Sequence, residues 1–380
     1  MIVVGALAMP LPDTLGYAAP VWVLQGLSYF TLSLHLLAMN FTIGACLLLI
    51  WTHFRNRAGH AGVKHFFGSS LPLGMSYVIT LGVPPLLFVQ VLYGQLFYSS
   101  SVLIGALWIL VIPAVLIAYA AFYYHKLQRE ARPRYQWAVV AVATTLLLCV
   151  GYIYVNNLTL SMSPDKWLRI YEAHPGGGIL HHGEPTVPSR YLLFLSGAFA
   201  AAGVALLWRG AFLFRWGYDT EANQSQKLGF RAFLLSPMLW IIAASWVYSS
   251  RPEDIKAMFV FDSTTVLLAV GVVSALVAIA FAYLSVGKRN LLFPLLSSLG
   301  IFGGMVCTVV FRDQVRLEYI KPYLDIASIP VNAQWGMLAL FLMALVVALA
   351  LLVVLMVKVL PKIAEGARER LEKTIAAGRT

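Results

Sequence analysis

The sequence has few charged residues for its length. Charged side chains make up 11% of the 380 residues, whereas hydrophobic side chains make up 60%. That leaves too little polar surface to cover a soluble globule, so the composition indicates an integral membrane protein. Because lipid offers no hydrogen-bond partner to an exposed backbone, we expect the long apolar runs to form helices.

Cysteine is also scarce, and its distribution excludes one kind of cofactor attachment. Cys46, Cys149 and Cys307 stand far apart in apolar runs, with no Cys-x-x-Cys or Cys-x-x-Cys-His sequence. A covalently attached c-type haem on this chain is therefore excluded, and the cysteines are expected to pack as small side chains. The sequence also lacks the Gly-rich dinucleotide fingerprint and the P-loop.

Nine apolar runs are long enough to cross a bilayer, which takes about 20 residues of helix. We predict an all-α integral membrane protein, with a single bundle over residues 1–357 and a cytoplasmic amphipathic tail over residues 358–380. The sixth run is short and contains Pro237. The predicted spans are residues 21–51, 71–98, 102–124, 136–155, 191–214, 233–250, 263–287, 291–311 and 335–357.

Lysine and arginine gather in alternate loops and in the tail. Because short cytoplasmic loops hold the excess of basic residues, this pattern predicts an outer N-terminus and a cytoplasmic C-terminus. We expect the cytoplasmic membrane of a bacterial or archaeal cell. The net charge of +11 then reflects topology and attraction to anionic lipid, with no reason to invoke a nucleic-acid partner.

The apolar spans contain one histidine. His35 lies about fourteen residues into the first span, roughly 20 Å deep at 1.5 Å per residue, and Asn40 and Thr42 follow it. Polar groups at that depth are costly and need a reason. An imidazole there either ligates a metal or haem iron or hydrogen-bonds a neighbouring carbonyl or hydroxyl, and the residue alone does not decide between these roles.

The second span carries polar residues toward its outer end. Pro84 and Pro85 are expected to kink the helix and free backbone carbonyls. Beyond them, Gln90 and Tyr93 are three residues apart and share a helix face. Hydrogen bonding between helices is the simplest explanation, although a buried glutamine amide needs several partners.

A dense group of charges follows the eighth span. Arg312, Asp313 and Arg316 lie where this helix is expected to leave the membrane. The simplest interpretation is a solvated outer cap whose charges pair with one another. The alternative is a pair of arginines that hold haem propionates or a quinone carbonyl.

The long loop before the fifth span contains three histidines. The sequence YEAHPGGGILHHGEP places His174, His181 and His182 among glycines and two glutamates. These residue types bind metals, but the spacing matches no specific site, and Gly-rich polar loops are usually plain surface.

Together these segments resemble subunit I of the cytochrome bd quinol oxidase family. HLLAMNFTIG, residues 35–44, has the spacing of the family's haem-ligand histidine and the Leu-Thr-Leu-Gly type stretch after it. FVQVLYGQLFY is similar to a segment of the family's second helix, and NNLTLSMSPDKW to the turn that closes its fourth. Asp313 and Arg316 resemble its Glu-x-x-Arg signature. The resemblance implies a nine-helix bundle in which His35 ligates the iron of b-type haem, with Gln90, Tyr93, Arg312, Asp313 and Arg316 around the cofactor.

The chain departs from the family where oxygen chemistry takes place. The fifth span lacks the family's second histidine, and the seventh span lacks its methionine. The third span lacks the family's two glutamates. The loop RPEDIKAMFVFD is much shorter than the family's quinol loop. What the resemblance implies is therefore not an oxygen-reducing oxidase. It implies a subunit that passes electrons between the quinone pool and an extracytoplasmic c-type cytochrome, which as an enzyme is a quinol/cytochrome c oxidoreductase component.

The expected docking surface for such a partner is basic. A cofactor-free anchor for other subunits of a respiratory complex is the main alternative. A transporter is a weaker one, because no acid lies within a span and no pair of broken helices repeats between the halves. The basic residues expected to face the partner are Lys166, Arg169, Arg190, Arg251 and Lys256.

Overall fold

The fold described here is that of a computed structural model. The described residues are 2–4, 7–9, 14–55, 60–128, 135–181, 183–257 and 263–348, with single positions at 350, 351, 354, 358 and 366. The predicted tail therefore lies almost entirely outside the described residues, as do positions 349, 352, 353 and 355–357 of the ninth predicted span. Within them, eight helical segments are long and apolar enough to cross a membrane, which supports a multi-pass membrane protein.

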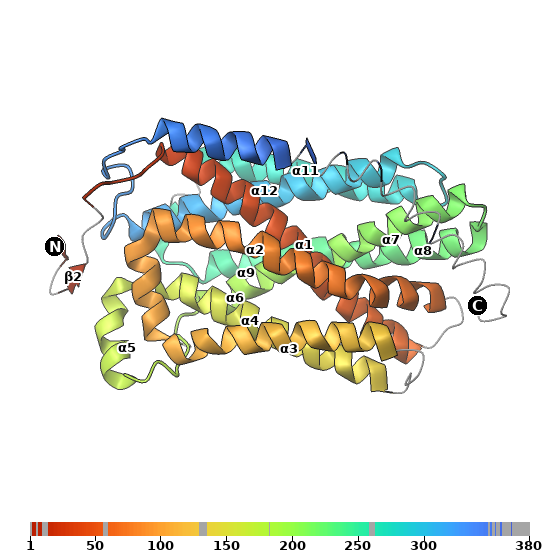
Figure 1. Ribbon diagram of the computed structural model, residues 1–380, viewed down its shortest axis with the longest axis horizontal. Helices are drawn as coiled ribbons and strands as arrows, with labels where there is room; N and C mark the ends of the chain where they lie inside the picture. The colour runs from red at the N-terminus through yellow and green to blue at the C-terminus, as the bar shows by residue number, and fades with distance from the viewer. Residues whose placement is uncertain are drawn as a thin grey trace.

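Long helices run along the molecule, as Figure 1 shows. In the first half these are α1 (Val21–Arg55), α2 (Ala61–Leu103), α3 (Gly105–Gln128) and α4 (Gln136–Leu160). The second half contains α6 (Thr186–Leu195), α7 (Ala198–Arg215), α8 (Asp219–Phe233), α9 (Leu235–Ser249), α11 (Ser263–Ser285) and α12 (Leu292–Ile320).

Shorter elements join or extend these helices. An apolar helix, Trp335–Ala348, covers the described part of the ninth predicted span, which leaves the predicted number of nine spans open. The remaining elements are a 3₁₀ turn (Pro164–Lys166), α5 (Trp167–Ala173), α10 (Glu253–Ala257) and an antiparallel pair of strands, β1 (Ile2–Val4) and β2 (Leu7–Met9).

Helices that follow one another in the chain pack together, α1 on α2, α3 on α4, α7 on α8 and α11 on α12. Helix α1 also contacts α4, α7 and α12, and it crosses the middle of the bundle in Figure 1. Close approach depends on small residues, as is usual between membrane helices. A Cβ on Gly44 of α1 would collide with the Ala198 carbonyl and come within 2.9 Å of the Ala202 Cβ, both on α7.

The fifth and sixth predicted spans are each made of two helices. Helices α6 and α7 form the fifth, and α8 and α9 form the sixth. Pro237 lies in the first turn of α9. Backbone N–H groups in the first turn have no hydrogen-bond partner within the helix, so a proline, which has no N–H, removes no bond there. The proline therefore fits inside this segment without interrupting α9.

Helix α2 differs from its predicted span in two ways. It begins at Ala61, ten residues before the predicted start, and its one non-helical residue is Tyr93, with φ −131° and ψ 28°. Pro84 and Pro85 both stay within helical backbone, so the departure from helical geometry occurs beyond the prolines that were expected to cause it. Figure 1 shows α2 turning across the bundle at one end.

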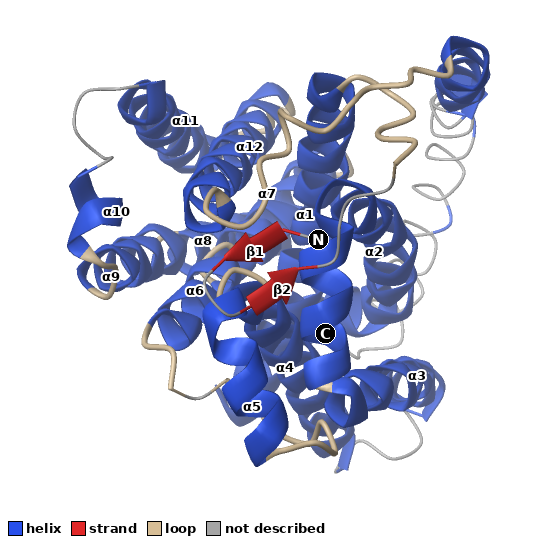
Figure 2. Ribbon diagram, turned by 90° about the vertical axis from the view of Figure 1, so that its left-hand side faces the viewer, coloured by secondary structure: helices blue, strands red, loops and turns tan. Residues whose placement is uncertain are grey.

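We call the end where α1 begins the N-terminal end of the bundle. An extended segment closes this end, because Tyr17 N–H donates to the Pro330 carbonyl and Asn332 N–H to the Tyr17 carbonyl, both at 2.9 Å. The Tyr17 hydroxyl donates to the Leu92 carbonyl at 2.9 Å, beside the bend of α2. Figure 2 looks onto this end and shows β1 and β2 across it. Its apolar cluster includes Leu92, Leu96 and Ile320.

Candidate functional site

A buried carboxylate joins three helices near the N-terminal end. Asp313 Oδ2 on α12 accepts hydrogen bonds from the hydroxyls of Tyr29 on α1 and Tyr93 on α2, both at 2.9 Å. Asp313 Oδ1 lies 3.3 Å from Arg316 Nη1, one helical turn away. Asp313 is 3% exposed and Arg316 is 5% exposed. The interpretation of these charges as a solvated cap is therefore wrong, although the expected pairing is present.

Tyr93, at the bend of α2, contacts both charges. The Arg316 guanidinium carbon lies 4.7 Å from the centroid of the Tyr93 ring, a cation–π contact, while the Tyr93 hydroxyl binds Asp313. A buried carboxylate is stable only when its oxygens have partners. Two tyrosine hydroxyls and one guanidinium supply them here.

Three further arginines lie beside this pair. They are Arg190 on α6, Arg251 just after α9 and Arg312 on α12. Arg190 repels each of the other two electrostatically. Arg251 is 8% exposed, and its burial together with the charge of Arg190 lowers its pKa to about 10. We call Arg190, Arg251 and Arg312 the arginine cluster.

Aromatic rings lie against two arginines of the cluster. The Arg312 guanidinium carbon lies 5.7 Å from the centroid of the Phe194 ring, and that of Arg190 lies 5.5 Å from the centroid of Tyr319. The Nε atoms of Arg190 and Arg312 are buried without an acceptor among the residues that the structure describes. Arg190 Nη1 also donates to Met162 Sδ at 3.6 Å, and no carboxylate of a described residue lies within 4.0 Å of Arg190 or Arg312.

Glu184, a carboxylate that interacts electrostatically with Arg190, already has a cationic partner. Glu184 Oε2 accepts a hydrogen bond from Lys166 Nζ at 2.8 Å, and its Oε1 accepts one from Thr186 Oγ1 at 3.0 Å. Burial would raise the pKa of Glu184, but hydrogen bonds from His181, Lys166 and Thr186 and the charge of Lys166 lower it to about 2. Glu184 is thus ionised and paired with Lys166.

His35 lies at a separate position between α1 and α2. Its Nδ1 donates to the Val78 carbonyl at 3.0 Å, so the proton sits on Nδ1 and Nε2 keeps its lone pair. Gly82 makes room for the ring, because a Cβ there would lie 2.9 Å from His35 Cε1. His35 comes six positions after Tyr29 on α1. The two residues are therefore about 9 Å apart along the helix axis and about 120° apart around it.

The predicted site residues thus fall into two groups. Tyr93, Asp313 and Arg316 meet directly, and Arg312 lies beside them next to the Phe194 ring. Gln90 is half-buried on α2, one turn before Tyr93. His35 instead contacts the backbone of α2, through its hydrogen bond to the Val78 carbonyl.

Residues absent from the prediction complete the site. Tyr29 and Phe194 were not among the predicted residues, and Arg190 and Arg251 were expected on a docking surface. The structure places both arginines within the protein, while Lys166 pairs with Glu184. Tyr29 could have been predicted from the sequence, because it is a residue with a polar hydroxyl within the first apolar span.

The loop histidines do not gather in the described part of the chain. His181 is buried, its backbone N–H donates to Asn156 Oδ1 at 3.0 Å, and its Nε2 lies 3.8 Å from Glu184 Oε2. His174 is exposed, and His182 lies outside the described residues. Among the residues that were searched, no three His, Cys, Asp or Glu side chains come close enough together to hold a metal ion.

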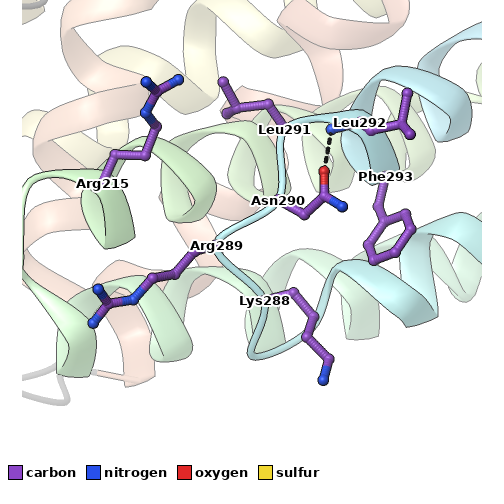
Figure 3. Close-up of a pocket in the computed structure, with 7 residues that line it drawn as sticks. All are labelled: Arg215, Lys288, Arg289, Asn290, Leu291, Leu292 and Phe293. Atoms are coloured by element: carbon purple, nitrogen blue, oxygen red, sulfur yellow. Dashed lines mark hydrogen bonds between the residues drawn. The ribbon is translucent and has the colours of Figure 1, made fainter.

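The opposite end of the bundle has an open depression of about 720 Å³. Figure 3 shows its three basic side chains pointing away from one another, and one of them, Arg289, donates to both carboxylate oxygens of Asp219 at 2.9 and 2.8 Å. The depression therefore lacks the convergent polar groups of a binding site. Its lining residues are Arg215, Lys288, Arg289, Asn290, Leu291, Leu292 and Phe293.

No family model matches the chain, and no curated protein matches it. The fold and the site define a class only: a multi-pass helical membrane protein with a buried polar network at one end of the bundle.

Proposed function

We propose that the protein is a membrane electron-transfer subunit that binds b-type haem through His35 and exchanges electrons with quinone and an extracytoplasmic c-type cytochrome. In this proposal nine helices span the inner membrane of a bacterium or archaeon, with the N-terminus outside and the C-terminus in the cytoplasm. One observation carries it. His35 donates from Nδ1 to the Val78 carbonyl within an apolar helix, which leaves Nε2 as a free ligand atom.

The hydrogen bond from His35 Nδ1 to a backbone carbonyl suits a haem ligand. Histidines that bind a metal through one nitrogen usually donate the other ring N–H to a carbonyl or carboxylate, which fixes the tautomer and the ring orientation. Val78 supplies that carbonyl, and Gly82 supplies the space. One or two such ligands suffice for haem iron, so a cluster of several ligating residues is not required.

The bound haem would supply one-electron transfer, and the protein would supply position and electrostatics. Cationic guanidiniums of Arg312 and Arg190 support the binding of carboxylates such as haem propionates, because charge-assisted bonds from arginine are strong and geometrically specific. The apolar cluster that closes the N-terminal end supports the exclusion of water. Lipid covers the exposed apolar faces of the helices.

The tyrosine pair suggests where quinone chemistry takes place. Oxidation of a quinol releases protons, and Tyr29, Asp313 and Tyr93 form a hydrogen-bonded chain able to hold or relay one. Gln90, one turn from Tyr93, offers an amide donor on the same helix. Among the five basic residues expected to face the cytochrome, only Arg169 is exposed and the other four are buried or half-buried, so the docking surface would be smaller than the sequence suggested.

The test is an absorption spectrum of the purified protein, recorded oxidised and reduced. We expect a reduced b-type band that is lost on His35→Ala and retained on His174→Ala, a matched change at an exposed histidine outside the helices. A colourless wild-type protein, purified from cells with sufficient haem, would overturn the proposal. A band that survives His35→Ala would overturn the assignment of the ligand.

A cofactor-free anchor for other subunits of a respiratory complex is the second candidate. The observation that favours it is that the hydrogen bond from His35 to Val78 is complete as a structural contact, and Asp313 has partners on both oxygens. This candidate predicts a colourless protein that co-purifies with partner subunits. The same spectrum therefore separates the two functions.

A further inference from the structure

Two neighbouring helical segments are interrupted where they pack together. The fifth span breaks at Ser196 and Gly197, between α6 and α7, and the sixth breaks at Leu234, between α8 and α9. The breaks lie side by side, because Ser236 Oγ in the first turn of α9 accepts the Ala200 N–H of α7 at 2.7 Å. A break inside a membrane leaves backbone groups that lipid cannot satisfy, so each such group needs a partner.

The break between α6 and α7 leaves polar backbone groups unpaired. The Ser196 N–H turns back to the Leu193 carbonyl at 3.3 Å, which ends the regular pattern of α6. The Gly197 N–H donates to no backbone carbonyl of a described residue, and the Ser196 carbonyl accepts from no described backbone N–H. At 1.5 Å per residue, Ser196 lies about 15 Å from the start of α6, and α7 continues for about 27 Å beyond the break. The unpaired groups are therefore well inside the segment.

Asn40 of α1 directs its amide at this break. Asn40 is 2% exposed, and its Oδ1 has no hydrogen-bond partner among the residues that the structure describes. A Cβ on Gly197 would lie 3.1 Å from Asn40 Nδ2 and 3.7 Å from Asn40 Oδ1, and its three nearest atoms would all belong to Asn40. A buried amide oxygen without a donor is unfavourable. The side chain and the break thus present unpaired polar groups to one another.

We propose that Asn40, Ser196 and Gly197 bind a water molecule in the break between α6 and α7. Water fits because it both donates and accepts: it can donate to Asn40 Oδ1 and to the Ser196 carbonyl, and it can accept from the Gly197 N–H. Buried waters make about three such bonds to groups that would otherwise stay unpaired. An anion would leave both oxygens unpaired, and a cation would leave the Gly197 N–H unpaired.

The bound water would serve as a joint between two pairs of helices. Helix α6 packs on α9, and α7 packs on α8. Both pairs meet at the breaks, where the water would replace a direct backbone bond between α6 and α7. The inference goes beyond the proposed function, since it holds with or without haem at His35.

The direct test is an experimental structure of the full chain in lipid nanodiscs, at a resolution that shows ordered water. We expect a density peak at hydrogen-bond distance, about 2.7–3.2 Å, from both Asn40 Oδ1 and the Gly197 nitrogen. The peak should remain in His35→Ala, so failure of the haem proposal would not remove it. A structure without the peak, in which Asn40 Oδ1 accepts directly from a protein donor, would overturn the inference.

Asn40→Leu supplies an independent readout, because leucine is of similar size but has no polar side-chain atom. If Asn40 binds water, the change removes one partner of that water, and the thermal unfolding midpoint should fall by about 2 °C or more. If Asn40 Oδ1 is simply unpaired, the change removes an unfavourable group, and the midpoint should rise. A higher midpoint in Asn40→Leu would therefore overturn the inference.

Asn156→Leu is the matched control. Asn156 is fully buried, its Nδ2 donates to the Tyr152 carbonyl at 3.0 Å, and its Oδ1 accepts from the His181 N–H at 3.0 Å. Both groups of this amide have protein partners, so the unfolding midpoint should fall when they are removed. The control sets the size of the loss that a satisfied buried asparagine produces in this protein.

A monovalent cation is the competing ligand for the oxygens of Asn40 and Ser196. Thermal unfolding in sodium, potassium and choline chloride at equal ionic strength tests for it, because a bound sodium or potassium ion would raise the midpoint above that in choline. Equal midpoints in the three salts, together with a lower midpoint in Asn40→Leu, support water. A midpoint that rises with sodium or potassium in the wild type but not in Asn40→Leu would overturn the assignment to water.

Discussion

The Tyr93 hydroxyl donates to Asp313 Oδ2 at 2.9 Å, which joins the bend of α2 to the C-terminal third of α12. These residues are 220 positions apart in the chain, and Tyr93 is the one residue of α2 with non-helical backbone angles. The same ring lies under the Arg316 guanidinium. The bend of α2 thus serves to bring one side chain onto both members of a buried ion pair.

Replacement of Asp313 by Asn should strongly destabilise the protein. The change leaves Arg316 buried without its anion, and breaking a buried pair in this way typically costs about 3–5 kcal/mol. Thermal or denaturant unfolding of the purified protein measures the effect. Asp219→Asn is the matched control, because its pair with Arg289 is exposed and should be worth less than about 1 kcal/mol. Equal losses in the two variants would contradict the burial of Asp313.

Close contact between α1 and α7 predicts a second effect. Gly44→Ala should destabilise by about 1–3 kcal/mol, the usual cost of overpacking, because the added Cβ meets the Ala198 carbonyl and the Ala202 side chain. Gly26→Ala on the same helix is the control. Nothing lies within 4 Å of a Cβ at position 26, so this variant should be neutral or slightly stabilising. A neutral Gly44→Ala would mean that the two helices are further apart.

Much of the fold could be predicted because long apolar runs in the sequence indicate membrane helices directly. The Asp313–Arg316 pair was also visible, since residues three apart share a helix face. Its burial was not visible, because the covering residues Tyr93 and Tyr29 come from helices whose rotation the sequence does not specify. The early start of α2 was missed for another reason. Lys64 and His65 end the apolar run, but a helix can continue beyond the lipid.

Acid sensitivity should arise at Glu184. Its pKa is about 2 in the folded protein against an ordinary value of 4.5. A carboxyl with a depressed folded pKa stabilises the protein fully above its unfolded pKa, and this contribution is lost as the pH falls toward the folded pKa. Between about pH 5 and pH 2 the wild-type unfolding midpoint should therefore fall more steeply than that of Glu184→Gln. Glu253→Gln, at a carboxylate that is 88% exposed, should follow the wild type.

Gly82→Ala tests whether space beside His35 matters for its role. The new Cβ would approach within 2.9 Å of Cε1 and 3.0 Å of Nδ1, so the imidazole must shift and its bond to the Val78 carbonyl must lengthen or break. If His35 binds haem, the reduced spectrum should shift or weaken while the protein remains folded, because the ring loses the partner that fixes its tautomer. Gly94→Ala on the same helix meets only ordinary contacts at 3.6 Å from the Tyr98 ring, and its spectrum should match the wild type. A folded Gly82→Ala with an unchanged haem spectrum would show that the orientation of His35 does not control the cofactor.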